Sequence, residues 1–184
     1  VVSLIFSLAR NIPFLALLLV MLLSILLGMG LPTTAAYIVA SALTVPALVK
    51  LGFPALASHM FVFYFAIISA ITPPVALAAY AASSLAGSNP DETGFQAMRL
   101  GLLAFIVPYA FCYDGGLLLQ KGFLWDIFAF LGGLGAAVAI GWGIEGFLRR
   151  PLSFWSRVLF LVMGILCLWP STPIRFLALA VVFG

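Results

Sequence analysis

The sequence predicts an all-α integral membrane protein. Of its 184 residues, 65% are hydrophobic and only 7% are charged, whereas a soluble domain carries about 25% charged residues to cover its surface. Apolar segments recur along the whole chain, separated by short connections that contain Gly, Pro or polar residues, as in proteins with several membrane helices. The formal net charge of +3 is spread along the chain, so we expect no nucleic acid partner.

Helix lengths organise the second half of the chain. A helix needs about 20 residues to cross the hydrocarbon core of a bilayer. The apolar segments 100–119 and 124–148 reach that length, and 154–169 nearly does. We therefore predict a helix over residues 97–119 and additional C-terminal transmembrane helices within residues 120–184. The Gly-rich stretch 132–143 is predicted to be a close-packing helix face, because it follows no strand as a nucleotide-binding loop would.

The first half contains shorter apolar segments around two interruptions. Segments 13–28 and 34–48 flank the sequence GMGLPTT and are too short for comfortable separate crossings. We interpret them as a re-entrant helical hairpin over residues 13–48. Segments 55–71 and 75–87 are equally short, and we interpret residues 55–87 as one membrane helix that is broken at Thr72-Pro73-Pro74.

Each interruption combines proline with hydroxyl side chains. A proline has no N–H, so carbonyl groups one turn earlier lose their helical partner. At membrane depth such backbone must be buried in protein or must line a polar cavity. Freed carbonyls and hydroxyls form an uncharged set of oxygen ligands, which suits Na⁺, whereas a divalent ion prefers carboxylates. The residues concerned are Pro32, Pro73, Pro74, Thr33, Thr34, Ser69, Thr72, Gly28 and Gly30.

Simpler explanations exist for single features. A proline kink often serves packing alone, and Ser or Thr hydroxyls often bond to the preceding turn. Paired interruptions favour a transport site instead. Asp114 is a candidate proton site because it lies near a membrane helix, and an interfacial or capping role is an equal alternative. We interpret His59 as an interfacial residue rather than as part of a proton relay.

The interrupted region also carries a family resemblance. Within residues 13–119 the chain has Gly-x-Gly-x-Pro-Thr-Thr-Ala, then Gly-x-Pro, then Thr-Pro-Pro-Val-Ala. This order and spacing resemble the large membrane subunit of tripartite ATP-independent periplasmic (TRAP) transporters, and most closely the fused permeases that work with TAXI-type binding proteins. The resemblance implies an elevator-type transporter fold, in which the hairpin and the broken helix form part of the transport domain.

The resemblance also implies roles for individual residues. The Na⁺ site would be formed by the Thr72 hydroxyl and by backbone oxygens around Gly28, Gly30 and Ser69. Na⁺ would be the coupling ion, and no other metal and no cofactor is expected. The neighbouring residues would line the substrate path: Pro32, Thr33, Thr34, Pro73 and Pro74.

The function implied is Na⁺-driven uptake of a small organic acid, delivered by a periplasmic TAXI-type binding protein, across a bacterial or archaeal inner membrane. Helix N-termini near Thr34 and Val75 favour an anionic substrate. Residues 1–119 would be the C-terminal half of the transport domain. The family's inverted N-terminal half is lacking, so we expect a C-terminal fragment. The alternatives are proton coupling and a non-transporting membrane scaffold; no enzyme activity is expected.

Basic residues predict the orientation in the membrane. Arg149, Arg150 and Arg157 cluster between two apolar segments, which indicates the cytoplasmic side. The segment 124–148 would then run from outside to inside. Lys121, at its other end, would face the periplasm.

Overall fold

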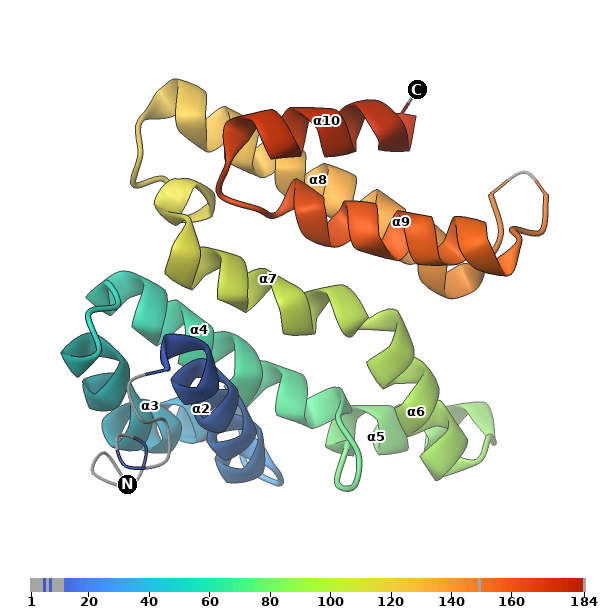
Figure 1. The fold of residues 1–184 in the computed structure, drawn as a ribbon. Helices are drawn as coiled ribbons and strands as arrows, with labels where there is room; N and C mark the ends of the chain where they lie inside the picture. Colours follow the sequence, from blue (N-terminus) through green and yellow to red (C-terminus); the bar gives the residue numbers. More distant parts are fainter. Residues whose placement is uncertain (1–4, 6, 8–11, 149, 184) are drawn as a thin grey trace. The chain divides into compact units, whose positions relative to one another are not determined.

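The computed structural model describes Ile5, Ser7 and residues 12–148 and 150–183. Arg149 and most of residues 1–11, with which the predicted 1–119 unit begins, therefore lie outside the described residues. Within the described part the chain is α-helical, with two short 3₁₀ segments and one isolated β-bridge but no strand. The predicted all-α class is therefore confirmed. The chain divides into two compact units, Val1–Pro108 and Tyr109–Gly184 (Figure 1). The predicted boundary of the transport domain at residues 119 and 120 stays a prediction.

Two helices form a hairpin at the start of the first unit. Helix α2 spans Pro13–Gly28 and has a proline in its first turn, where the missing N–H costs nothing. Helix α3 spans Thr33–Lys50. Both helices pack against α4, Ala55–Ile68 (Figure 1). Of the helices in the described residues, α3 and α8 are each long and apolar enough to span a membrane, so the re-entrant nature of the hairpin stays a prediction.

The chain leaves the α-helical conformation after α4. A 3₁₀ turn, η1, covers Ser69–Ile71, and helix α5 begins only at Leu77 and ends at Ala86. The helix thus resumes two residues after Val75, the position expected from the sequence. Helix α6, Pro90–Leu100, follows, and the Asn89 side chain caps it by accepting hydrogen bonds from the N–H groups of Asp91 and Glu92.

The predicted helix 97–119 differs from the observed structure. Helix α6 and helix α7, Leu102–Tyr113, are bent by 40° at Gly101. A Cβ atom on Gly101 would lie 2.9 Å from Ile71 Cδ1, so the bend occurs where η1 packs closely. Helix α7 then ends before Asp114, whose extended backbone stops the helix and whose side chain caps η2, Gly115–Leu118. The capping role considered for Asp114 is therefore confirmed.

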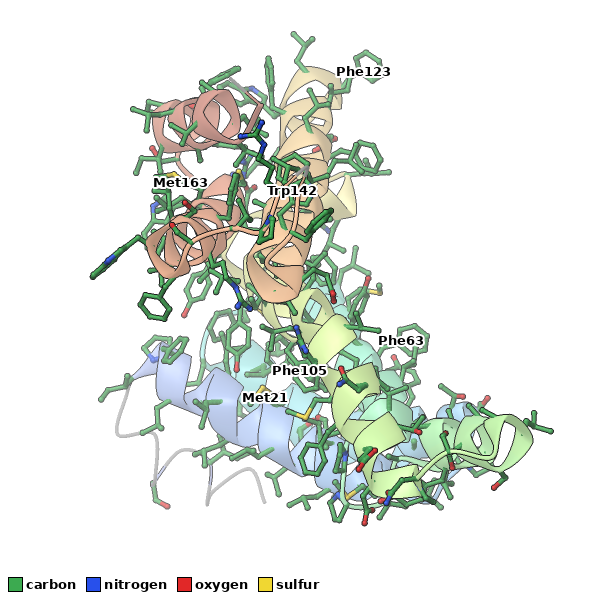
Figure 2. All side chains as sticks on the ribbon, turned by 90° about the vertical axis from the view of Figure 1, so that its right-hand side faces the viewer. Met21, Phe63, Phe105, Phe123, Trp142 and Met163 are labelled. Atoms are coloured by element: carbon green, nitrogen blue, oxygen red, sulfur yellow. The ribbon has the colours of Figure 1, made fainter. Side chains whose placement is uncertain are left out.

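The second unit contains three further helices that pack side by side: α8, Phe123–Glu145; α9, Phe154–Cys167; and α10, Thr172–Phe183 (Figure 1). A Cβ on Gly132 would lie 2.5 Å from the carbonyl oxygen of Cys167, and a Cβ on Gly143 would lie 2.8 Å from Leu161 Cγ, which confirms the close packing predicted for the Gly-rich face of α8. Trp142 of α8 packs edge-on against Phe160 of α9, with ring centroids 5.5 Å apart (Figure 2). Arg157 donates hydrogen bonds to the carbonyls of Gly143 and Ile144, which satisfies the C-terminus of α8.

Candidate functional site

The hairpin meets the broken helix at Gly28. A Cβ atom on Gly28 would lie 2.5 Å from Ser69 Oγ and 3.0 Å from the carbonyl oxygen of Ala66. Gly28 is the last residue of α2, and Ser69 is the first of η1; both are buried. Only a glycine allows this approach. The structure thus brings together Gly28 and Ser69, which lie 41 positions apart in the sequence.

The hydroxyl groups at the break donate to nearby carbonyls. Ser69 Oγ donates to the carbonyl of Ala66 at 2.6 Å, and Thr72 Oγ1 donates to that of Ile68 at 2.8 Å. This is the bonding to the preceding turn that the simpler explanation predicts. Each hydroxyl uses its one proton in this way, so its oxygen lone pairs stay free to accept a hydrogen bond or to contact a cation. Ser69 and Thr72 therefore present buried oxygen atoms.

The backbone at the break is only partly satisfied by helical bonds. The carbonyl of Ser69 accepts from the Thr72 N–H at 3.2 Å. In a regular helix the carbonyl of Ala70 would accept a hydrogen bond from the N–H of residue 73 or 74. Both residues are prolines, and neither has an N–H to donate. The carbonyl of Pro74 lies 2.9 Å from the hydroxyl of Tyr80. The break therefore offers a backbone oxygen at Ala70, while the one at Pro74 is already engaged.

Ala76 adds conformational strain at the same place. It adopts a left-handed conformation with φ of 35°, which costs a residue other than glycine roughly 1–2 kcal/mol. Gly94 of α6 lies against this segment, since a Cβ on it would be 3.5 Å from Pro73 Cγ and 3.6 Å from Ala76 Cβ. Strained backbone held by its surroundings is commoner at functional sites than elsewhere, which supports a role for the break beyond packing.

Ser24 is a residue that the sequence analysis missed. It lies one turn before Gly28 on the same face of α2, because residues four apart are neighbours on a helix. It is fully buried, and its Oγ atom has no hydrogen-bond partner among the described residues. An unsatisfied buried hydroxyl costs about 1–3 kcal/mol. The signal in the sequence was a single hydroxyl in the apolar run of α2, four residues before the glycine.

Four of the other six predicted residues lie on the exposed turn of the hairpin, whereas Pro73 and Pro74 lie at the break, where Pro73 is half-buried and Pro74 is exposed. Gly30, Pro32, Thr33 and Thr34 are all exposed. A Cβ on Gly30 would meet nothing within 4 Å, and its φ of 79° explains why glycine occupies the position. The structure thus gathers Gly28, Ser69 and Thr72 in a buried cluster and leaves four residues at the hairpin turn. The roles of these four and of Pro73 and Pro74 stay predictions.

A second polar cluster surrounds Asp114 in the other unit. Its Oδ2 atom is 2.6 Å from Arg175 Nη2, and its Oδ1 atom is 2.8 Å from Lys121 Nζ and accepts from the Gly116 N–H at 3.0 Å. Burial raises the pKa of Asp114, but the bonds from Lys121, Gly116 and Arg175 lower it by more, so this pKa lies below its ordinary value of 3.8. Asp114 is therefore ionised at neutral pH, which argues against its serving as a proton carrier.

The same cluster predicts a specific acid sensitivity. Because the pKa of Asp114 is lower in the folded protein than its ordinary value of 3.8, its ion pairs stabilise the fold fully above that value and are lost as the pH falls through the folded pKa. We expect the difference in unfolding free energy between the wild type and Asp114→Asn to be constant from about pH 7 to pH 5. Below about pH 4 this difference in unfolding free energy should become smaller, as measured by thermal unfolding of the purified protein. A difference that stays constant down to about pH 2 would contradict the ionised, ion-paired state of Asp114.

His59 makes a different kind of contact. Its Nδ1 atom is 2.9 Å from the hydroxyl of Tyr37 in an exposed position, on α4 and α3 of the first unit. No group of three or more His, Cys, Asp or Glu that could hold a metal ion occurs among the described residues.

Comparisons with known proteins identify the family. The family model for the tripartite ATP-independent periplasmic transporter, DctM component, matches residues 1–125. Neither a search of curated proteins nor a search of solved structures gives a match. The matched range includes the hairpin, the broken helix and Asp114, and it covers more than half of the 184 residues. The chain therefore belongs to the DctM family, the inner-membrane permease component of TRAP secondary transporters, which work with a periplasmic binding protein.

Proposed function

We propose that the chain supplies the second hairpin and the broken helix of a Na⁺-driven permease that imports an organic carboxylate. The observation that carries this proposal is the contact between Gly28 and Ser69, because it joins the hairpin to the break through a glycine that nothing larger can replace. The resemblance of residues 13–119 to the fused permeases supports a TAXI-type binding protein as the partner. An elevator-like movement of residues 13–48 with 55–87 follows from the same resemblance.

The oxygen atoms at the break fit a monovalent cation. Na⁺ would be held by the hydroxyls of Ser69 and Thr72 and by backbone oxygens near Gly28 and Ala70, and its charge would stabilise oxygen atoms that lack hydrogen-bond donors. Ser24 Oγ is buried and unpartnered among the described residues, as expected for a side chain that completes such a set. Gly28 keeps α2 close to η1, so ligands from both segments face one another only while the hairpin stays docked.

The hairpin turn fits the substrate path. Pro32 precedes α3, and the first turn of that helix has unpaired N–H groups and the positive end of the helix dipole. The exposed hydroxyls of Thr33 and Thr34 lie at that turn. With Pro73 and Pro74 of the break, they form the proposed path for a carboxylate substrate, since hydrogen-bond donors and a positive dipole both favour an anion.

Replacing Thr72 by valine tests the ion site. Thr72→Val keeps the shape of the side chain and removes the hydroxyl. We expect the Na⁺ concentration for half-maximal uptake to rise by about tenfold in proteoliposomes that contain the complete permease and its binding protein. Thr44→Val is the matched control, because Thr44 is also buried and its hydroxyl donates the same kind of bond, to the carbonyl of Ala40 at 2.7 Å, within α3.

Ion substitution and partner omission complete this experiment. Uptake should require both Na⁺ and the binding protein, and K⁺ should not replace Na⁺. Equal Na⁺ dependence in the wild type, Thr72→Val and Thr44→Val would refute the site. Uptake that follows a proton gradient without Na⁺ would instead support proton coupling, and it would require a carrier other than the ion-paired Asp114.

A further inference from the structure

A pocket opens beside Asp114, at the end of the second unit where α8 and α10 begin. Its volume is about 390 Å³, and its polar lining comes from the start of α8 and from the connection between α9 and α10. The residues that line it include Lys121, Trp125, Ser171, Thr172, Arg175 and Asp114. Ser171, Thr172 and Arg175 lie beyond residues 1–125, the range matched by the family, so the family does not account for this pocket.

The charge of the pocket is positive. Both carboxylate oxygens of Asp114 are engaged, Oδ1 by Lys121 and Oδ2 by Arg175. Two cations thus share one carboxylate, which leaves one positive charge among the side chains that line the pocket; Asp126 lies outside this lining and accepts the backbone N–H of Lys121 at 3.1 Å. Arg175 is 5% exposed and Asp114 is 3% exposed, so these charges are fixed by the surrounding structure. The side chain of Lys121 is 45% exposed and can move towards a ligand.

The pocket offers several hydrogen-bond donors, and the hydroxyls of Ser171 and Thr172 can donate as well as accept. Arg175 Nε donates to Cys167, and Nη2 donates to Asp114 and to Trp169. Its Nη1 group has no hydrogen-bond partner among the described residues, and Arg175 is one of the residues that line the pocket. Thr172 begins α10, whose first turn adds the positive end of the helix dipole. Pro173 has no N–H and the Arg175 N–H donates to the carbonyl of Ser171, so the first turn offers the N–H groups of Thr172 and Ile174. Such a set of donors binds an anion.

The surroundings of the pocket indicate where that anion comes from. Trp125, Trp169 and Phe123 are 54%, 51% and 79% exposed, and Phe123 extends away from the start of α8 (Figure 2). Exposed Trp side chains at helix ends are typical of the membrane–water interface. At such an interface a ligand would lie among lipid headgroups. The lining sets two cationic side chains against one engaged carboxylate, which favours an anionic ligand over a cationic one.

We propose that this pocket binds the headgroup phosphate of an anionic phospholipid. Lys121, Arg175 and the first turn of α10 hold the phosphate, and the exposed aromatic side chains lie along the lipid chains. The lipid thereby links the start of α8 to the start of α10. This site is separate from the proposed Na⁺ site, which lies in the other unit.

The test measures how strongly each lipid binds, through the rise of the unfolding temperature that the lipid causes. Delipidated protein in a neutral detergent is titrated with phosphatidylglycerol, with phosphatidylcholine of the same acyl chains, and with inorganic phosphate, and the rise of the unfolding temperature gives each apparent Kd. We expect saturable binding of phosphatidylglycerol, and Lys121→Gln should weaken it by about tenfold. Lys50→Gln is the matched control, since Lys50 is the other lysine and lies at the end of α3.

A second variant tests the pocket without changing the ion pairs of Asp114 with Lys121 and Arg175. Thr172→Val removes a hydroxyl from the pocket without changing its charge, and it should weaken phosphatidylglycerol binding by a smaller factor. Equal affinity for phosphatidylcholine and phosphatidylglycerol, or equal losses in Lys121→Gln and Lys50→Gln, would overturn the proposal. Binding of inorganic phosphate without stronger binding of phosphatidylglycerol would overturn the lipid as the source of the phosphate.

Discussion

Replacing Asp114 by asparagine should lower the free energy of unfolding by about 3 kcal/mol, because removal of one partner from a buried ion pair typically costs about 3–5 kcal/mol. The amide would keep the shape of the side chain but would leave the guanidinium of Arg175, 5% exposed, without a counter-charge. The cap on η2 would weaken as well, because the Asp114 carboxylate accepts the bond from the Gly116 N–H. Thermal or denaturant unfolding of the purified protein in detergent measures the loss.

Two controls separate the ion pair from a general loss of charge. Glu145→Gln removes an exposed carboxylate at the end of α8 and should change the unfolding free energy by less than about 0.5 kcal/mol. The double replacement Asp114→Leu with Arg175→Leu removes both buried charges and should recover much of the loss. A loss in Asp114→Asn no larger than that in Glu145→Gln would show that the pair contributes little.

The position of this ion pair explains how the C-terminal helices join the family region. Asp114 lies within residues 1–125, which the DctM family covers, whereas Arg175 lies in α10, beyond it. Two residues 61 positions apart thus form a buried contact. Because breaking a buried pair is far costlier than breaking an exposed one, this contact holds α10 against the start of the second unit.

Some of this structure follows from local chemistry in the sequence. Glycine and proline determine where helices end, so the ends of α2 and α4 could be placed from GMGLPTT and Thr-Pro-Pro. The hydroxyls at the break could be identified for the same reason, since Ser and Thr beside proline have nearby carbonyls to bond. The close packing of the Gly-rich face of α8 could also be predicted, because small residues at helical spacing favour close contact between helices.

Other features depend on contacts between distant segments, which a local pattern does not contain. An apolar run gives no sign that α7 stops at Tyr113, because the stop depends on Asp114 and on its partners Lys121 and Arg175. Ser24 looks like an isolated polar residue until the packing of α2 shows that its hydroxyl is buried without a partner among the described residues. The bend at Gly101 likewise follows from its contact with Ile71.

Gly28→Ala should be the most informative change at the proposed ion site. The new Cβ would lie 2.5 Å from Ser69 Oγ in η1 and 3.0 Å from the backbone oxygen of Ala66 in α4, so α2 must move away from the end of α4 and from η1. Overpacking of this kind costs about 1–3 kcal/mol. We expect that loss in unfolding free energy together with a rise of about tenfold in the Na⁺ concentration for half-maximal uptake, because the ligands from the two segments no longer face one another.

Gly30→Ala provides the matched control on the same turn. Its Cβ would meet nothing within 4 Å, but its φ of 79° strains any residue other than glycine, at a cost of roughly 1–2 kcal/mol. The two variants should therefore lose similar stability while only Gly28→Ala weakens the response to Na⁺. Equal responses to Na⁺ in both variants would mean that the approach of α2 to η1 serves packing alone.

The double variant Gly28→Ala with Ser69→Ala distinguishes packing from ligation. Removing Ser69 Oγ relieves the closer of the two clashes, so part of the lost stability should return. If Ser69 only packs, the response to Na⁺ should return with it. If Ser69 contributes an oxygen ligand, as proposed, the response should stay weak although the hairpin is docked again. Measuring stability and Na⁺ response on the same preparations thus separates the contact that the structure shows from the ion site that it supports.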